Sequence, residues 1–185
     1  MDENWKETIA KIREVKSALA AANPQAVPEG AMPPGAALRA ISAVERRIRR
    51  RLPPSYRAFL NLHDGWPQFF EGASLFGTRE LSRPAYADIT HATFAAYETP
   101  IPECGPPSRP EGRPDAMIPF GMDAQATTIF AFNPAVVRPD GEMEVIMWIN
   151  ELGDRAETFD SFLVMVLEML EVDLRERESL LKKSA

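Results

Sequence analysis

The sequence LPPSYRAFLNLHDGW at residues 52–66 predicts a short helix that begins at a proline and ends at a glycine. Pro54 suits the first helical position, because the N–H that proline lacks would have no partner there. Gly65 can take the left-handed conformation that closes the last turn of a helix, which folds Trp66 back beneath it. One face of this helix is apolar, since large side chains recur on it at intervals of three and four residues: Tyr56, Phe59, Leu60 and His63.

Strand-like segments follow this helix and predict a sheet. They are the runs ASLFG at 73–77, MIPFGMD at 117–123, TTIFAFN at 127–133 and VIMWI at 145–149. Turn signals at 139–141 and 150–154 indicate short connections, which favour antiparallel pairing. Three further helices are expected: one at 38–52, one at 84–97 and one that opens near Thr158. We therefore predict an α+β fold, with a mainly antiparallel sheet and helices packed on one side of it and at its ends.

The order of these segments resembles the SUKH superfamily, which is known for a fungal cell-wall assembly regulator of the Smi/Knr type and for many bacterial immunity proteins. The resemblance covers about residues 38–170 and lies in the order of the motifs. Two positions depart from the family pattern: residues 124–126, Ala-Gln-Ala, stand where a glycine is usual, and Asn133 stands where an aspartate is frequent. The residues that carry the resemblance are Leu52, Pro53, Tyr56, Phe59, Leu60, Asp64, Gly65, Trp66, Phe120, Gly121 and Phe162.

The composition indicates a single domain that needs no disulfide. The chain has 185 residues, enough for one self-sufficient core, and its only cysteine, Cys104, cannot pair within the chain. The N-terminus lacks the apolar segment of a secretion signal, and no apolar run approaches the roughly 20 residues of a membrane span. We therefore expect a cytoplasmic protein that does not enter a membrane. The net charge of −6 disfavours attraction to phosphate backbones and slightly favours a basic partner.

Proline-rich segments divide the chain. Residues 1–23 are expected to form an amphipathic N-terminal helix that docks on the domain or on a partner, because prolines follow it directly. Residues 24–174 are expected to form one SUKH-like domain with a proline-rich surface loop at 98–116. Residues 175–185 have the alternating charges of a C-terminal tail, which is expected to fray into solvent.

The sequence lacks the patterns of a catalytic, cofactor or metal site. One cysteine and two separated histidines do not provide the ligands of a zinc site, and no glycine-rich phosphate or dinucleotide loop is present. His63 and Asp64 are adjacent, but neighbours on a helix project about 100° apart, so His63 is interpreted as an edge of the core. We accordingly predict no catalytic residue, no metal and no cofactor.

The run RRIRRR at residues 46–51 is the sharpest charge feature. Ile48 takes the buried face of the helix that contains it, so the arginines are expected on a solvated face near the helix C-terminus, where the dipole favours positive charge. Nucleic-acid binding is an alternative, disfavoured by the acidic chain and by the lack of stacking aromatics beside the run. A second alternative is pairing with acidic groups on a protein partner.

The resemblance implies a non-catalytic protein-binding domain. Many bacterial members of the family are immunity proteins that bind and neutralise a cognate toxin, often a nuclease, so the expected partner is a protein toxin. The alternative is a regulatory or scaffold protein that binds an endogenous protein, as the fungal members are thought to do. Loops carry recognition while the scaffold holds them. The candidate contact residues are therefore the acidic and polar loop positions Glu71, Asp123, Gln125, Asp140 and Glu142.

Overall fold

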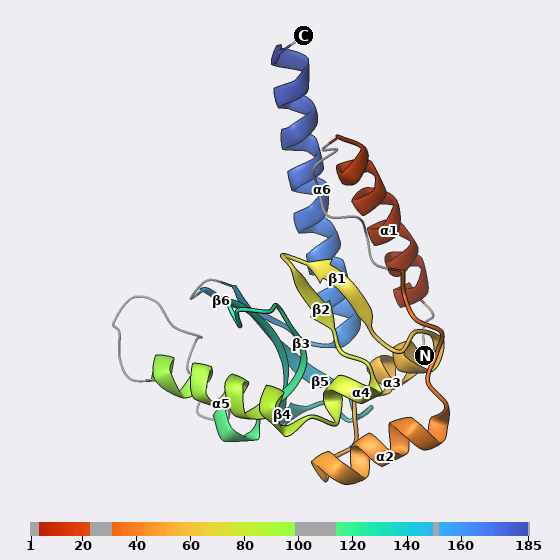
Figure 1. Cartoon of the computed structure of the whole chain (residues 1–185), viewed down its shortest axis with the longest axis vertical. Coiled ribbons are helices and arrows are strands. Elements are labelled where there is room, and N and C mark those ends of the chain that lie inside the picture. Colours follow the sequence, from red (N-terminus) through yellow and green to blue (C-terminus); the bar gives the residue numbers. More distant parts are fainter. Residues whose placement is uncertain (1–3, 23–30, 99–113, 150–151, 185) are drawn as a thin grey trace. The chain divides into compact units, whose positions relative to one another are not determined.

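The computed structural model describes residues 4–22, 31–98, 114–149 and 152–184. These residues belong to two compact units (Figure 1). One unit is drawn from residues 31–159 and contains the sheet, and the other combines the two ends of the chain, residues 1–30 and 160–185.

The sheet has six strands in the order β1-β2-β3-β4-β5-β6, and every neighbouring pair is antiparallel. With the surrounding helices it gives an α+β fold, which confirms the predicted class. Each of the four predicted runs contains a strand. The six strands are β1 (Trp66–Phe70), β2 (Ala73–Leu75), β3 (Ile118–Met122), β4 (Thr128–Val137), β5 (Met143–Ile149) and β6 (Leu152–Ala156).

The two edge strands, β1 and β6, are absent from the sequence prediction. β6 lies where a turn was predicted at 150–154, and that prediction is wrong for residues 152–154. Its sequence, LGDRA, has little intrinsic strand propensity, but its backbone pairs along β5 from Val145↔Ala156 to Ile149↔Leu152. The strand therefore exists because a long neighbour offers it a ladder of hydrogen bonds.

The helices of the sheet-containing unit contact both faces of the sheet. Strand alternation puts Phe132 and Trp148 on opposite faces, since Trp148 pairs with Ile129. Phe94 of α5 meets the Trp148 ring with their centroids 6.1 Å apart, whereas Tyr56 of α3 meets the Phe132 ring with their centroids 5.2 Å apart. The structure thus adds a helix on the second face to the expected arrangement. The helices are α2 (Leu38–Ile48), α3 (Pro54–Leu62), α4 (Thr78–Leu81), α5 (Pro84–Glu98) and the 3-10 turn η1 (Pro114–Ala116).

Tyr56 joins the signature helix α3 to the sheet. Its side chain is fully buried, and its hydroxyl donates to the carbonyl oxygen of Phe76 at 2.6 Å, with the Phe120 carbonyl at 3.2 Å. Its ring stacks on Phe59 and meets Phe120 and Phe132 edge-on. Burial raises the pKa of Tyr56 well above 10, so the hydroxyl stays a donor at physiological pH. The signature tyrosine is therefore a structural anchor.

A buried polar cluster on the Trp148 face explains the asparagine that departs from the family pattern. Glu144 is 4% exposed and accepts a hydrogen bond from the Asn133 amide at 2.9 Å. Arg155 pairs with the same carboxylate oxygen at 2.8 Å. The other end of the Asn133 amide accepts from the backbone N–H of Ala135 at 3.1 Å. An aspartate at this position could not donate, and it would place a second buried negative charge beside Glu144.

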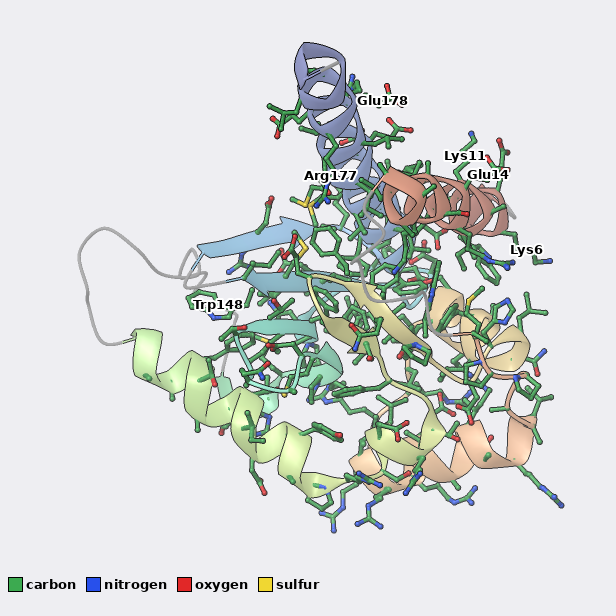
Figure 2. The ribbon with its side chains drawn as sticks, turned by 45° about the horizontal axis from the view of Figure 1, so that its top comes forward. Lys6, Lys11, Glu14, Trp148, Arg177 and Glu178 are labelled. Carbon is green, nitrogen blue, oxygen red and sulfur yellow. The ribbon has the colours of Figure 1, made fainter. Side chains whose placement is uncertain are left out.

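The unit formed by the chain ends consists of α1 (Asn4–Ala22) and the greater part of α6 (Phe159–Ser184), which lie side by side (Figure 1). The predicted helix at 4–22 is confirmed, and Trp5 is buried at 4% exposure. Lys11 projects outward from α1, pairs with Glu7 at 2.9 Å and lies near enough to Glu171 of α6 for their charges to interact (Figure 2).

The predicted fraying of the C-terminal residues is wrong, because α6 continues to Ser184. Alternating charges can stabilise an exposed helix when opposite signs stand four residues apart. Arg177 and Asp173 have this spacing and pair at 2.8 Å. The charge pattern that suggested a tail thus supports a longer helix.

Candidate partner-binding groove

A groove with a volume of about 770 Å³ lies at the end of the sheet where the β1–β2 and β3–β4 turns are neighbours. We call it the acidic groove, because the charged residues among its described lining are Asp64, Glu80 and Asp123. The remaining lining includes aromatic and polar side chains, which are Trp66, Gln68, Ser74, Tyr86 and Gln125. The groove is within the range of volumes typical of ligand-binding clefts.

Asp64 is held in the groove wall by the end of α3 and the start of α4. Gly65 follows it with φ of 99°, a conformation that suits glycine, and turns the chain into β1. The Asp64 carboxylate accepts hydrogen bonds from the Thr78 backbone N–H at 2.6 Å and the Thr78 hydroxyl at 2.9 Å. A side chain at Gly77 would collide with the Asp64 carbonyl oxygen. Asp64 therefore connects the turn after α3 to the start of α4, and its carboxylate is held in a fixed position beside the groove.

Asp123 organises the β3–β4 turn on the opposite wall. Its carboxylate accepts from the Thr128 N–H at 2.8 Å, the Thr127 hydroxyl at 2.8 Å and the Gln125 N–H at 3.4 Å. Partial burial raises the pKa of Asp123, but these hydrogen bonds, led by that from Thr128, outweigh burial and hold the pKa below its ordinary value of 3.8. The group is therefore anionic at neutral pH. Ala126 in the same turn has φ of 57°, a left-handed conformation that glycine adopts more readily than alanine.

Three of the five predicted contact residues gather at this end of the sheet. Asp123 and Gln125 line the acidic groove, and Glu71 is exposed in the β1–β2 turn next to Gly72, another lining residue. Glu71 has φ of 48° and lies in the tight turn between Phe70 and Ala73, which are the last paired residues of β1 and β2. These three side chains belong to one surface.

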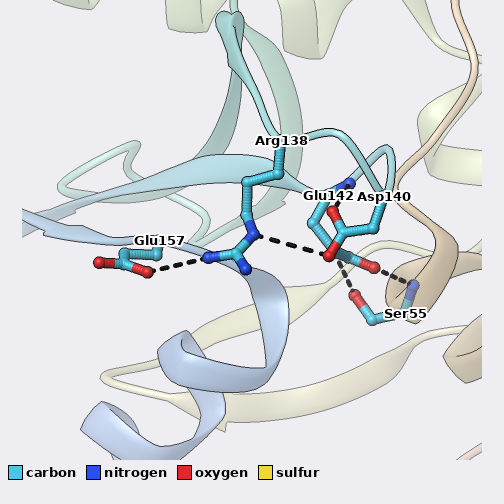
Figure 3. Close-up of polar contacts among 5 residues, drawn as sticks. All are labelled: Ser55, Arg138, Asp140, Glu142 and Glu157. Atoms are coloured by element: carbon cyan, nitrogen blue, oxygen red, sulfur yellow. Dashed lines mark hydrogen bonds and ion pairs between the residues drawn. The ribbon is translucent and has the colours of Figure 1, made fainter. Parts of the chain in front are cut away.

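The other two predicted residues, Asp140 and Glu142, lie in the turn between β4 and β5, at the end of β4 that is remote from the β3–β4 turn. Figure 3 shows their contacts. The Glu142 carboxylate accepts from the Ser55 N–H and hydroxyl, both at 2.7 Å, and so caps the first turn of α3. Arg138 bridges Asp140 at 3.6 Å and Glu157 at 3.0 Å. The structure gives both acidic residues a role in the β4–β5 turn, and their contact with a partner stays a prediction.

Sequence reasoning missed two members of the groove, Glu80 and Tyr86. Glu80 belongs to the four-residue helix α4, which is too short to give a periodic pattern. Tyr86 lies near the start of α5 and packs on the Phe76 ring with their centroids 4.4 Å apart. An aromatic residue in a predicted amphipathic helix could have suggested packing, but nothing in the sequence indicates which groove it would line.

The geometry of His63 and Asp64 does not form an acid–base pair. The Asp64 carboxylate is engaged by Thr78, and the His63 ring lies tilted against Phe59 with their centroids 6.1 Å apart. His91 shares a hydrogen bond of 2.9 Å with the Met117 carbonyl, so its Nε2 carries the proton. Within the described residues, no cluster of three or more histidine, cysteine, aspartate or glutamate side chains could hold a metal ion. No helix in the described part of the chain combines the length and apolar character of a membrane span.

Comparison with known protein families identifies the family of this chain. The model of the SMI1 / KNR4 family (SUKH-1) matches residues 35–167, a range that includes α2 to β6, the lining of the acidic groove except Pro33, and the first turns of α6. None of the curated proteins matches the sequence. The family match covers well over half of the chain and agrees with the signature contacts of Tyr56, Asp64 and Gly65. The chain therefore belongs to the SMI1 / KNR4 family (SUKH-1).

Proposed function

We propose that this chain is a non-catalytic protein-binding domain that receives a basic segment of its partner in the acidic groove. The observation that carries the proposal is the charge of the groove, whose ionised lining groups, Asp64, Glu80 and Asp123, are all carboxylates. Asp64 and Asp123 are fixed by hydrogen bonds to backbone N–H groups, so binding costs them little side-chain entropy.

The physiological role that we propose is immunity: the protein binds a cognate toxin in the cytoplasm and blocks it by stoichiometric occlusion. Many toxins of this kind act on nucleic acids and are basic, and the net charge of −6 would steer such a partner toward the groove. Occlusion needs no catalytic group.

Two charge variants test the proposal. Glu71→Lys combined with Gln125→Lys places two lysines beside the acidic groove, while Glu168→Lys combined with Val172→Lys places two on the exposed surface of α6. Both pairs replace one carboxylate and one neutral side chain, so they change the net charge equally. All four positions are exposed, which leaves the core of each variant intact.

The assay is capture of the tagged protein's partner from a lysate of its source in moderate salt, followed by mass spectrometry. We expect one toxin-like protein, encoded beside this chain, at near-equal stoichiometry, and we expect the groove pair to lose it while the α6 pair retains it. Recovery of only host proteins would replace immunity with a regulatory or scaffold function. Equal retention by both pairs would remove the acidic groove from the proposal.

A further inference from the structure

A second groove, with a volume of about 660 Å³, lies in the same unit between the end of α2, the α4–α5 junction and the start of β3. We call it the arginine groove, because Arg47, Arg50 and Arg83 line it. Glu80 and Tyr86 line both grooves, so the two are neighbours. The chain thus carries a basic groove directly beside an acidic one.

The three arginines come from two segments far apart in the sequence, the end of α2 and the α4–α5 junction, and the carboxylates of Glu80 and Asp115 line the same groove. Within the described part of the chain, Arg47, Arg50 and Arg83 form no ion pair. Other arginines of this unit do: Arg57 pairs with Glu45 at 3.4 Å, and Arg155 pairs with Glu144 at 2.8 Å. The arginine groove therefore keeps its guanidinium donors available for a ligand.

The fold divides the arginine run at 46–51 into two groups. α2 ends at Ile48, and Arg49 takes a left-handed conformation with φ of 55°, which changes the direction of the chain. All of these arginines are exposed, but only Arg47 and Arg50 of the run line the groove, where Arg83 joins them. Tertiary contacts thus bring two arginines of the run and one distant arginine to one concave site.

The rest of the lining favours a peptide over a nucleic acid. Ile118, Pro119 and Pro134 provide apolar surface for side chains. The carboxylates in the lining are those of Glu80 and Asp115, and the carboxylate of Glu80 can accept a backbone N–H group. A phosphate backbone has no N–H to offer and would be repelled by these two carboxylates. The Tyr86 ring packs against the ring of Phe76, so one of its faces is occupied and it is a poor platform for stacked bases.

We propose that the arginine groove binds an acidic peptide segment of a protein partner, with two or more carboxylates held by Arg47, Arg50 and Arg83. Guanidinium groups bind carboxylates through paired, charge-assisted hydrogen bonds. The apolar surface would take a side chain between the carboxylates. This proposal goes beyond the basic-segment function and stands without it, because it concerns a different groove and the opposite charge.

The test uses fluorescence anisotropy with a labelled peptide of alternating glutamate and leucine as the probe. The same peptide with glutamine in place of glutamate, a lysine–leucine peptide and a single-stranded oligonucleotide of equal length serve as comparisons. Arg47→Gln, Arg50→Gln and Arg83→Gln are combined in one variant. Its matched control combines Arg46→Gln, Arg51→Gln and Arg79→Gln, which removes the same charge from exposed positions outside the groove.

We expect the wild-type chain to bind the glutamate peptide and the groove variant to bind it at least tenfold more weakly, while the control variant changes affinity by less than about twofold. Equal losses in both variants would show diffuse electrostatics and overturn the proposal. So would tighter binding of the oligonucleotide, or no binding of the glutamate peptide up to about 1 mM. The lysine–leucine peptide reports on the acidic groove, so the failure of one groove is distinguishable from the failure of the other. Thermal melts of each variant establish that it is folded.

Discussion

Replacing Tyr56 with phenylalanine should destabilise the sheet-containing unit without changing its shape. The substitution removes one buried hydroxyl and leaves the ring in place among Phe59, Phe120 and Phe132. The Phe76 carbonyl loses its 2.6 Å hydrogen bond, whereas the Phe120 carbonyl keeps the one that it accepts from the Phe76 N–H at 2.7 Å. One buried acceptor is therefore left without its hydroxyl donor.

The expected loss of stability follows from this one unsatisfied acceptor. An unsatisfied buried acceptor costs about 1–3 kcal/mol, so the free energy of unfolding should fall by about 2 kcal/mol. For a chain of this length the corresponding decrease in Tm is roughly 4–8 °C. Removing the whole side chain, as in Tyr56→Ala, should cost about 3–5 kcal/mol because a cavity is added.

Urea denaturation followed by tryptophan fluorescence measures the effect, since Trp66 and Trp148 are buried in the same unit. Tyr86→Phe is the matched control: Tyr86 is half-buried, and its variant should lie within about 0.5 kcal/mol of wild type. If Tyr56→Phe is equally mild, the hydroxyl does not anchor α3 and the structural explanation of the signature tyrosine is wrong.

The pH dependence of stability in the wild type and in Tyr56→Phe gives a second check. Because the folded pKa of Tyr56 is raised above 10, the unfolded chain loses its proton first as pH rises. The contribution of this group to stability is complete below pH 10 and declines above it. Tyr56→Phe lacks this titration, so its deficit relative to wild type should shrink by about 1.4 kcal/mol per pH unit above that value. A constant deficit would refute the assigned burial.

Three further variants test the turns and the polar cluster. Ala126→Gly should raise the urea midpoint by the equivalent of about 0.5–1 kcal/mol, because glycine tolerates the φ of 57°, whereas Ala124→Gly should give no gain. Asn133→Asp should lower stability at pH 7 by about 2 kcal/mol or more through repulsion with Glu144, and an unchanged midpoint would contradict the buried contact. Asp123→Asn should lower stability at neutral pH by about 1–2 kcal/mol. Since the folded pKa of Asp123 is depressed, that deficit should disappear as the pH falls below 3.8, and a deficit that persists there would exclude the carboxylate as its cause.

The sequence by itself determined the elements that depend on local pattern. α1 and α5 follow from their apolar periodicity, and α3 follows from Pro54 and Gly65, because a proline and a glycine set the ends of a helix wherever it lies. The central strands β3 to β5 follow from their runs of apolar residues and the turn at 139–141. The net charge of −6 also favours a basic protein partner.

Only the tertiary structure decided which side chains share a surface. β6 forms because β5 lies beside it, and Asn133 is required because Glu144 is buried opposite it. Arg83 joins Arg47 and Arg50 in one groove through contacts between segments that no local pattern connects. The periodicity of apolar residues indicates which face of a helix or strand is buried. Sheet register and the packing of distant turns depend instead on the free energy of the whole fold. For that reason the scaffold was largely predictable from sequence, and the two oppositely charged grooves were not.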